Sequence, residues 1–116
     1  MATRIYLTSA EGRTGKSTVA VGLLETLTAS VARVGVFRPI VRADVERDYI
    51  LELLVEHASA GQVYEDCVGV DYDTLHADPD AAIATIVERF AEVEARCDAV
   101  LILGSDYTDV GTPTEL

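Results

Sequence analysis

The segment EGRTGKST, residues 11–18, most constrains how this chain can fold, because it lies between a β-favouring run and a helical pattern. The run is RIYLT, residues 4–8, and the pattern covers residues 16–30. Lys16 is the only lysine of a chain that has eight arginines. A single ammonium group between Gly15 and Ser17 therefore calls for a chemical explanation.

A glycine-bearing turn that ends in Gly, Lys and Ser, between a strand and a helix, is the phosphate-binding P-loop arrangement. Backbone N–H groups then point at an anion, Lys16 neutralises phosphate charge, and the hydroxyl of Ser17 can ligate Mg²⁺. The motif GxxxxGK[ST] requires glycine at position 10, where this chain has Ala10, and Gly12 lies inside the loop instead. The alternative is a plain helix start, in which Gly15 eases the turn and Lys16 is solvated.

Further strand and helix patterns alternate after residue 30. VGVFRPI, residues 34–40, predicts a strand that Pro39 closes. Asp44 can cap a following helix that ends at residues 58–61. One face of this helix carries Ile50, Leu53, Leu54 and His57. Residues 63–77 have no clear period and are interpreted as a connection with one short element at most.

A last helix and strand follow this connection. Asp78 and Pro79 form a helix start signal. The apolar stripe of this helix consists of Ile83, Ile86, Val87, Phe90 and Val93. AVLIL, residues 99–103, is a continuous apolar run typical of a parallel strand covered on both faces.

The order β, α, β, α, α, β predicts an α/β fold, a P-loop NTPase-like three-layer α/β/α sandwich with a mainly parallel sheet. Three strands with an unprotected edge are a poor place to end a sheet, and Thr112 and Pro113 resemble the opening of a further helix. We therefore expect residues 1–116 to be a partial domain that self-associates.

The formal charge of −11 and a pI near 4.4 argue against nucleic acid or anionic membrane as a partner, because the summed field repels polyanions. The sequence has no run long enough for a membrane span and no signal peptide, which predicts a cytoplasmic protein. Cys67 and Cys97 have no metal or redox spacing and are interpreted as reduced structural thiols.

The other candidate site residues have more than one interpretation. Folds of this kind place a metal-holding carboxylate at a second strand end, but residues 99–103 end in Leu103, and Asp106 comes three residues late. Asp106 is then either a metal ligand or a turn residue. Arg38 either binds a phosphate or carboxylate ligand or pairs with an acidic side chain. His57 and His76 are interpreted as structural rather than catalytic.

The quoted motifs resemble those of one known family, and the resemblance covers essentially the whole chain. Residues 8–27, VFRPI, residues 76–90, and GSDYTD followed by PTEL resemble the N-terminal P-loop domain of long-form bacterial phosphate acetyltransferase, which is similar in turn to dethiobiotin synthetase. The positions that match the family's phosphate site are Gly12, Gly15, Lys16, Ser17, Thr18 and Arg38. The family often has a glutamate where this chain has Leu103.

The resemblance implies a cytoplasmic, homo-oligomeric enzyme that interconverts acetyl-CoA and phosphate with acetyl phosphate and CoA. Its chemistry belongs to a C-terminal domain, with a middle domain between, so no catalytic residue is assigned to this chain. The implied role here is regulation and assembly, with ATP or another phosphate-bearing metabolite and Mg²⁺, held by Ser17 and Asp106, as candidate ligands. The alternatives are an ATP-dependent enzyme resembling dethiobiotin synthetase and a purely structural domain with a relic loop.

Overall fold

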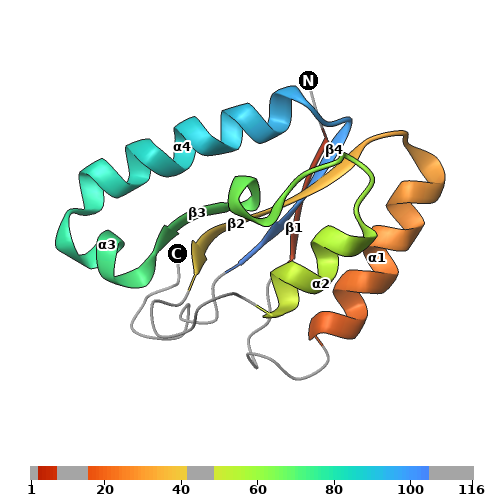
Figure 1. The fold of residues 1–116 in the computed structure, drawn as a ribbon, viewed down its shortest axis with the longest axis horizontal. Coiled ribbons are helices and arrows are strands. Elements are labelled where there is room, and N and C mark those ends of the chain that lie inside the picture. The colour runs from red at the N-terminus through yellow and green to blue at the C-terminus, as the bar shows by residue number, and fades with distance from the viewer. Residues whose placement is uncertain (1–2, 8–15, 42–48, 105–116) are drawn as a thin grey trace.

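The computed structural model describes residues 3–7, 16–41 and 49–104, without the side chains of residues 16–19 and 49–50. Four strands form one parallel sheet in the order β1-β4-β2-β3 (Figure 1). They are β1 (Thr3–Leu7), β2 (Val34–Val41), β3 (Val68–Asp71) and β4 (Ala99–Leu103). The helices are α1 (Lys16–Ser30), α2 (Tyr49–His57), the 3₁₀ helix η1 (Tyr64–Cys67), α3 (Tyr72–Ala77) and α4 (Pro79–Ala95).

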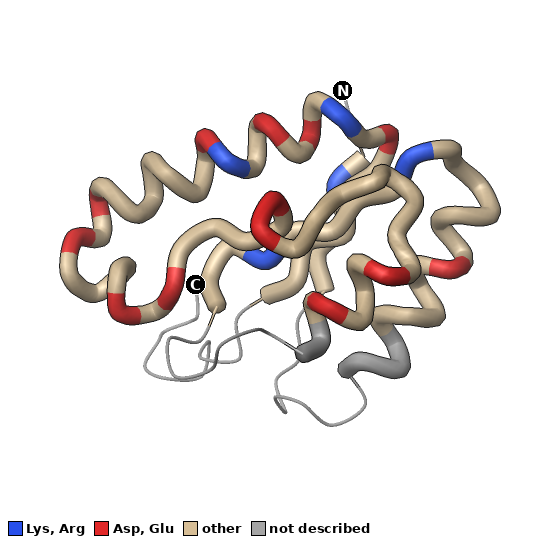
Figure 2. Tube along the Cα trace, in the orientation of Figure 1, with Lys and Arg blue, Asp and Glu red and all other residues tan. Residues whose placement is uncertain are grey.

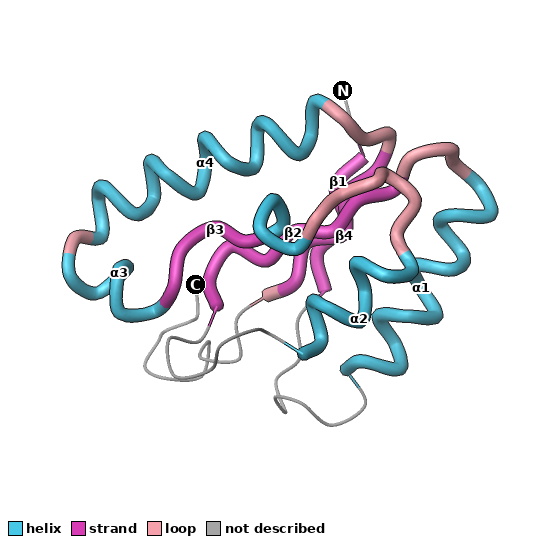
Figure 3. Tube along the Cα trace, in the orientation of Figure 1, coloured by secondary structure: helices cyan, strands magenta, loops and turns pink. Residues whose placement is uncertain are grey.

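The helices lie on both faces of the sheet, which gives the three expected layers (Figure 3). On one face, α1 and α2 pack over a core that includes Leu24, Leu54 and the even-numbered side chains Val34 and Val36 of β2. On the other face, α4 packs over Phe37, Val100 and Ile102. Because successive strand residues point to opposite faces, both faces of β2 and β4 are apolar.

The central strand β4 pairs with β1 on one side and with β2 on the other. Leu7 is level with Leu103, and Phe37 with Ile102. All five residues of β4 are buried, in agreement with the uninterrupted run AVLIL. The strand most shielded from water is therefore the one with the most uniformly apolar sequence.

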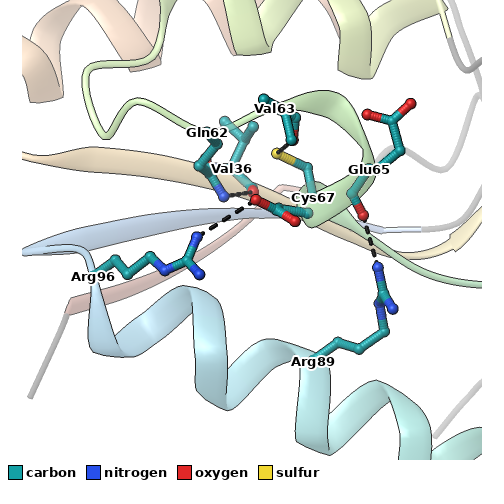
Figure 4. A network of polar contacts seen from close by, with 8 residues as sticks. Val36, Gln62, Val63, Glu65, Cys67, Arg89 and Arg96 are labelled. Carbon is teal, nitrogen blue, oxygen red and sulfur yellow. Dashed lines mark hydrogen bonds and ion pairs between the residues drawn. The ribbon is translucent and has the colours of Figure 1, made fainter.

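On the side of β2 away from β4, two residues rather than a strand pair with the first half of β2. The Gln62 amide accepts a hydrogen bond from Val36 N–H at 2.8 Å and donates one to Val36 C=O at 3.2 Å (Figure 4). Ser59 does the same for Val34, with its Oγ accepting at 2.9 Å and its backbone N–H donating at 3.0 Å. These bonds satisfy backbone groups that β3, which pairs only from Arg38 onward, does not reach.

The structure confirms most predicted elements and corrects three details. Residues 63–77 contain the strand β3 as well as η1 and α3, so the sheet has a fourth strand that the sequence interpretation lacked. Ile83 and Val87 of the α4 stripe are 54% and 63% exposed. His57 is exposed rather than on the buried face of α2. Within the described residues, no helix has the length and apolar character needed to cross a membrane.

Asp78 caps α4 as predicted. Its side chain accepts a hydrogen bond from Ala81 N–H at 3.2 Å, and Pro79 occupies the first turn of the helix. Proline is tolerated there because its missing N–H would have no partner inside the helix. The proposed cap Asp44 lies outside the described residues.

Candidate functional site

The carboxyl edge of the sheet is the candidate site. Because all four strands are parallel, their last residues lie at the same edge, and α1 begins there since it must run back from the end of β1 (Figure 1). Lys16 is the first residue of α1, as the motif predicts. In parallel α/β sheets, ligands bind outside this edge, where helix N-termini present their free N–H groups.

The structure describes only part of the predicted site. Gly12, Gly15 and Asp106 lie outside the described residues. For Lys16, Ser17 and Thr18 it shows the helical backbone of the first turn of α1 and not the side chains. Their assignment to a phosphate therefore stays a prediction, while the strand, the helix start and their order are confirmed.

Arg38 is the predicted site residue whose side chain the structure describes. It is 3% exposed and follows Val34 and Val36 on the face of β2 that α1 and α2 cover. Its Nη2 donates a hydrogen bond to the carbonyl oxygen of Gly104 at 3.1 Å. Gly104 N–H in turn donates to the carbonyl oxygen of Leu7 at 2.8 Å. These bonds connect the ends of β2, β4 and β1 beneath the start of α1.

A buried guanidinium is costly unless polar groups or an anion compensate for lost water. Figure 2 shows acidic residues spread along the helices, and Arg38 is the only buried charged residue among those described. The positive charge at the carboxyl edge is thus set inside a strongly acidic molecule. The two predicted partners of Arg38, a ligand anion and an acidic side chain, would each balance this charge.

Leu103 is the last residue of β4, at the position where the resemblance implies a glutamate. Its side chain is fully buried and belongs to the core between the sheet and helices α1 and α2. This is the same face as Arg38, so a carboxylate at residue 103 would be directed toward the start of α1. In this chain the position contributes packing and offers no metal ligand.

Asp71 is the described acidic residue at the carboxyl end of β3. Its Oδ1 accepts a hydrogen bond from Thr74 N–H at 2.7 Å and thereby caps α3. Hydrogen bonds from the side chain and then the backbone of Thr74 hold the pKa of Asp71 below its usual range. Asp71 therefore serves local structure.

The remaining titratable candidates are two histidines and two cysteines. His57 is exposed, with Nδ1 3.0 Å from the carbonyl oxygen of Leu53, and the ring of His76 stacks edge-on against Tyr72 at 4.4 Å. Cys67 and Cys97 are buried free thiols, as expected, and burial raises the pKa of Cys67 to about 12. No group of three or more His, Cys, Asp or Glu residues that could hold a metal occurs in the described part of the chain.

Sequence reasoning did not identify the contact between Arg38 and Gly104. The alternation of Val34, Val36 and Arg38 along β2 is the signal that places this side chain on the α1 face. The carbonyl partner follows from the register of β2 with β4, which no sequence pattern specifies.

Comparisons with known proteins agree with this architecture. A sequence model described as an AAA domain (AAA_26) matches residues 3–115. The chain is 30% identical over 114 residues to phosphate acetyltransferase of Synechocystis sp. and 29% identical over 118 residues to phosphate acetyltransferase of Nitratidesulfovibrio vulgaris. Each alignment covers 92% of this chain and 16% of the relative, so the chain spans about a sixth of their length. With its parallel sheet and helix start at Lys16, the chain belongs to this AAA domain family and is a relative of the P-loop domain of phosphate acetyltransferase.

Proposed function

We propose that this chain is the regulatory and assembly domain of a phosphate acetyltransferase and that it binds a phosphate-bearing small molecule at the carboxyl edge of its sheet. The observation that carries the proposal is the buried guanidinium of Arg38, which lies at this edge on the face where α1 begins. A fixed cation and the N-terminus of a helix at one site favour a multiply charged anion.

Each site residue has a distinct role in this proposal. Gly12 and Gly15 allow the loop backbone to approach the phosphate, and Lys16 neutralises its charge. Arg38 fixes a second oxygen from below, because its hydrogen bond to Gly104 holds the guanidinium in place. Ser17 and Thr18 contribute hydroxyl groups in the first turn of α1. If Mg²⁺ accompanies the phosphate, Ser17 and Asp106 hold it, and the ion supplies charge neutralisation.

The proposal assigns binding rather than turnover to this domain. Leu103 replaces a carboxylate that would help to hold a metal ion, and its buried apolar side chain stabilises no developing charge. The transfer of acetyl between CoA and phosphate then belongs to another part of the full-length protein. Binding at the present domain would alter that activity through the assembly of subunits.

Isothermal titration calorimetry with ATP and MgCl₂ tests the phosphate site. We expect saturable binding by the unmodified chain and a loss of about tenfold or more in affinity, about 1.4 kcal/mol, for Lys16→Ala and for Arg38→Met. Arg96→Met is the matched control, because Arg96 is exposed and pairs with Asp66 at 3.4 Å, away from the carboxyl edge. Equal affinities in all four proteins would contradict the proposal.

Assays of the same proteins separate the alternatives. Phosphate release with a carboxylate substrate would support an enzyme resembling dethiobiotin synthetase. Absence of binding in every protein would support a relic loop. In the full-length protein, Lys16→Ala should remove the effect of the nucleotide on acetyl phosphate formation while it leaves the rate without nucleotide unchanged.

A further inference from the structure

A groove lies on the α4 face of the sheet beside β1, away from the phosphate site. It has a volume of about 310 Å³. Its lining includes Arg4 and Tyr6 of β1, Phe37 of β2, Ile102 of β4, and Val87 and Phe90 of α4. Tyr6 is 70% exposed and Val87 is 63% exposed. Large exposed apolar side chains gathered in one groove indicate a surface that another element covers.

The position of α4 explains why the groove is open. This helix packs mainly against β3 and β2, which form the other side of the sheet. Its contacts with β1 run through Arg4, whose Nε donates to Glu94 at 2.7 Å and whose guanidinium lies 5.3 Å from the centre of the Phe90 ring. Beyond Arg4, the part of this face of β1 that carries Tyr6 thus has no helix above it within the described residues.

The order of the strands specifies which element fits there. The steps from β1 to β2 and from β2 to β3 move across the sheet in one direction with α1 and α2 on one face. The step from β3 to β4 moves back with α4 on the opposite face. Right-handed crossovers require this pattern, because the connecting helix changes to the other face of the sheet when the chain reverses its direction across the strands. A further backward step from β4 to the free side of β1 must therefore place its helix on the α4 face, over the groove.

We propose that the groove is the docking site for a crossover helix of the same polypeptide, C-terminal to Leu116, that leads to a strand beside β1. Two observations support this occupant. Among the described strands, β1 pairs only with β4, so its other side can accept a strand. The chain spans 16% of the length of its relatives, which leaves protein to supply the helix.

The chemistry of the groove defines the docking face of the helix. The aromatic rings of Tyr6, Phe37 and Phe90 line the groove. Those of Phe37 and Phe90 are in contact, with 5.5 Å between their centres. A helix with large aliphatic residues at a spacing of three to four positions would fill such a surface.

Hydroxyl-radical footprinting with mass spectrometry tests the proposal, with residues 1–116 compared with the full-length protein in the absence of nucleotide. We expect the labelling of Tyr6 to fall several-fold in the full-length protein, since its ring becomes covered. Val63 and Ile83 are the internal controls, because they are 55% and 54% exposed and do not line the groove. Equal labelling of Tyr6 in the two proteins would overturn the proposal. Protection of Tyr6 in the 116-residue chain that grows with concentration would also overturn it, in favour of a second copy.

A pair of substitutions on α4 provides an independent test. Val87→Lys should lower the urea midpoint of the domain in the full-length protein and leave that of residues 1–116 nearly unchanged, because its side chain is covered only in the former. Ile83→Lys, a similarly exposed position one turn away, should have little effect in either protein. Equal effects of Val87→Lys in both proteins would contradict a docking helix. Neither test depends on phosphate binding, so the two proposals fail separately.

Discussion

Arg38 of β2 donates a hydrogen bond from Nη2 to the carbonyl oxygen of Gly104, 3.1 Å away, directly after the end of β4. One side chain therefore ties together two neighbouring strand ends at the edge where α1 begins. Arg38 is 3% exposed, so the orientation of its side chain is set by the surrounding protein before any ligand arrives. Such preorganisation reduces the entropy that binding must overcome.

Replacement of Arg38 should affect binding more than stability. Arg38→Met keeps most of the side-chain volume but leaves Gly104 C=O without this donor, which costs about 1–3 kcal/mol, while removal of a buried charge offsets part of that loss. We expect a small change in the free energy of unfolding by urea denaturation, together with the loss of phosphate affinity. Unfolding of the variant under native conditions would contradict this prediction.

Gln62 should be essential for the first half of β2. Gln62→Ala removes the partner of both Val36 N–H and Val36 C=O, and each unsatisfied buried group costs about 1–3 kcal/mol. We expect a clear decrease in the free energy of unfolding and faster hydrogen exchange of the Val36 amide. Gln62→Glu provides the control, because it keeps the acceptor for Val36 N–H and loses the donor to Val36 C=O. This variant should recover stability relative to wild type as the pH falls and its carboxyl becomes protonated.

The ion pair between Arg4 and Glu94 should make stability sensitive to acid. The hydrogen bond from Arg4 lowers the pKa of Glu94 below its ordinary value, about 4.3. Because the folded chain then binds fewer protons than the unfolded chain, this stabilisation is present above about pH 4.3 and is lost as the pH falls through the lowered pKa.

Glu94→Gln should therefore be less stable than wild type near neutral pH, and the difference should shrink in acid. Urea denaturation at a series of pH values measures it. Glu88→Gln, on the exposed side of the same helix, controls for the removal of one negative charge from α4. A difference between wild type and Glu94→Gln that stays constant down to acid pH would contradict the prediction.

Gly35 should not tolerate a side chain. A Cβ at this position would lie 2.5 Å from Cys97 Sγ and 2.9 Å from Gln62 Oε1. Gly35→Ala should cost about 1–3 kcal/mol by overpacking, measured by thermal or urea denaturation. The double variant Gly35→Ala with Cys97→Ala removes the closest atom and should recover part of this loss relative to Cys97→Ala alone. Strict additivity of the two substitutions would show that this contact is not the cause.

Both thiols should be inert in the folded protein. Burial, and then the nearby charge of Asp66, raise the pKa of Cys67 to about 12, and burial raises the pKa of Cys97. Since the thiolate is the reactive form, we expect little reaction with a disulfide reagent near pH 8 in the native state and reaction of both cysteines in urea. Immediate labelling of either cysteine without denaturant would contradict this expectation.

The sequence predicted the elements in which local preference and burial agree. The bounds of α1 at Lys16–Ser30 and of β4 at Ala99–Leu103 match the expectation, because the start at Lys16 and the run AVLIL are strong local signals. The cap at Asp78 is correct for the same reason. The strand β3, VGVD, was not predicted because its four residues pair with β2 through tertiary contacts that no local period reports.

The apolar stripe of α4 shows a second limit of prediction from the sequence. Ile83 and Val87 belong to its apolar period, but α4 packs over β3 and β2 through Ile86, Phe90 and Val93 instead. Periodicity tells which residues share a helix face and not whether a neighbour covers that face. For the site, the sequence predicted Arg38 and the helix start, whereas the contact of Arg38 with Gly104 depends on the register of β2 and β4.

The position of β4 between β1 and β2 has a consequence for synthesis on the ribosome. β1 and β2 emerge early, and β2 can pair with β3, but β1 cannot join them until residues 99–103 leave the exit tunnel, because β4 lies between β1 and β2. Long-range parallel pairing of this kind is slow, since distant parts of the chain must meet before any contact rewards them. The sheet is therefore incomplete until β4 has been synthesised. Until then, helices α1 and α2 lie next to apolar strands that β4 has not yet joined.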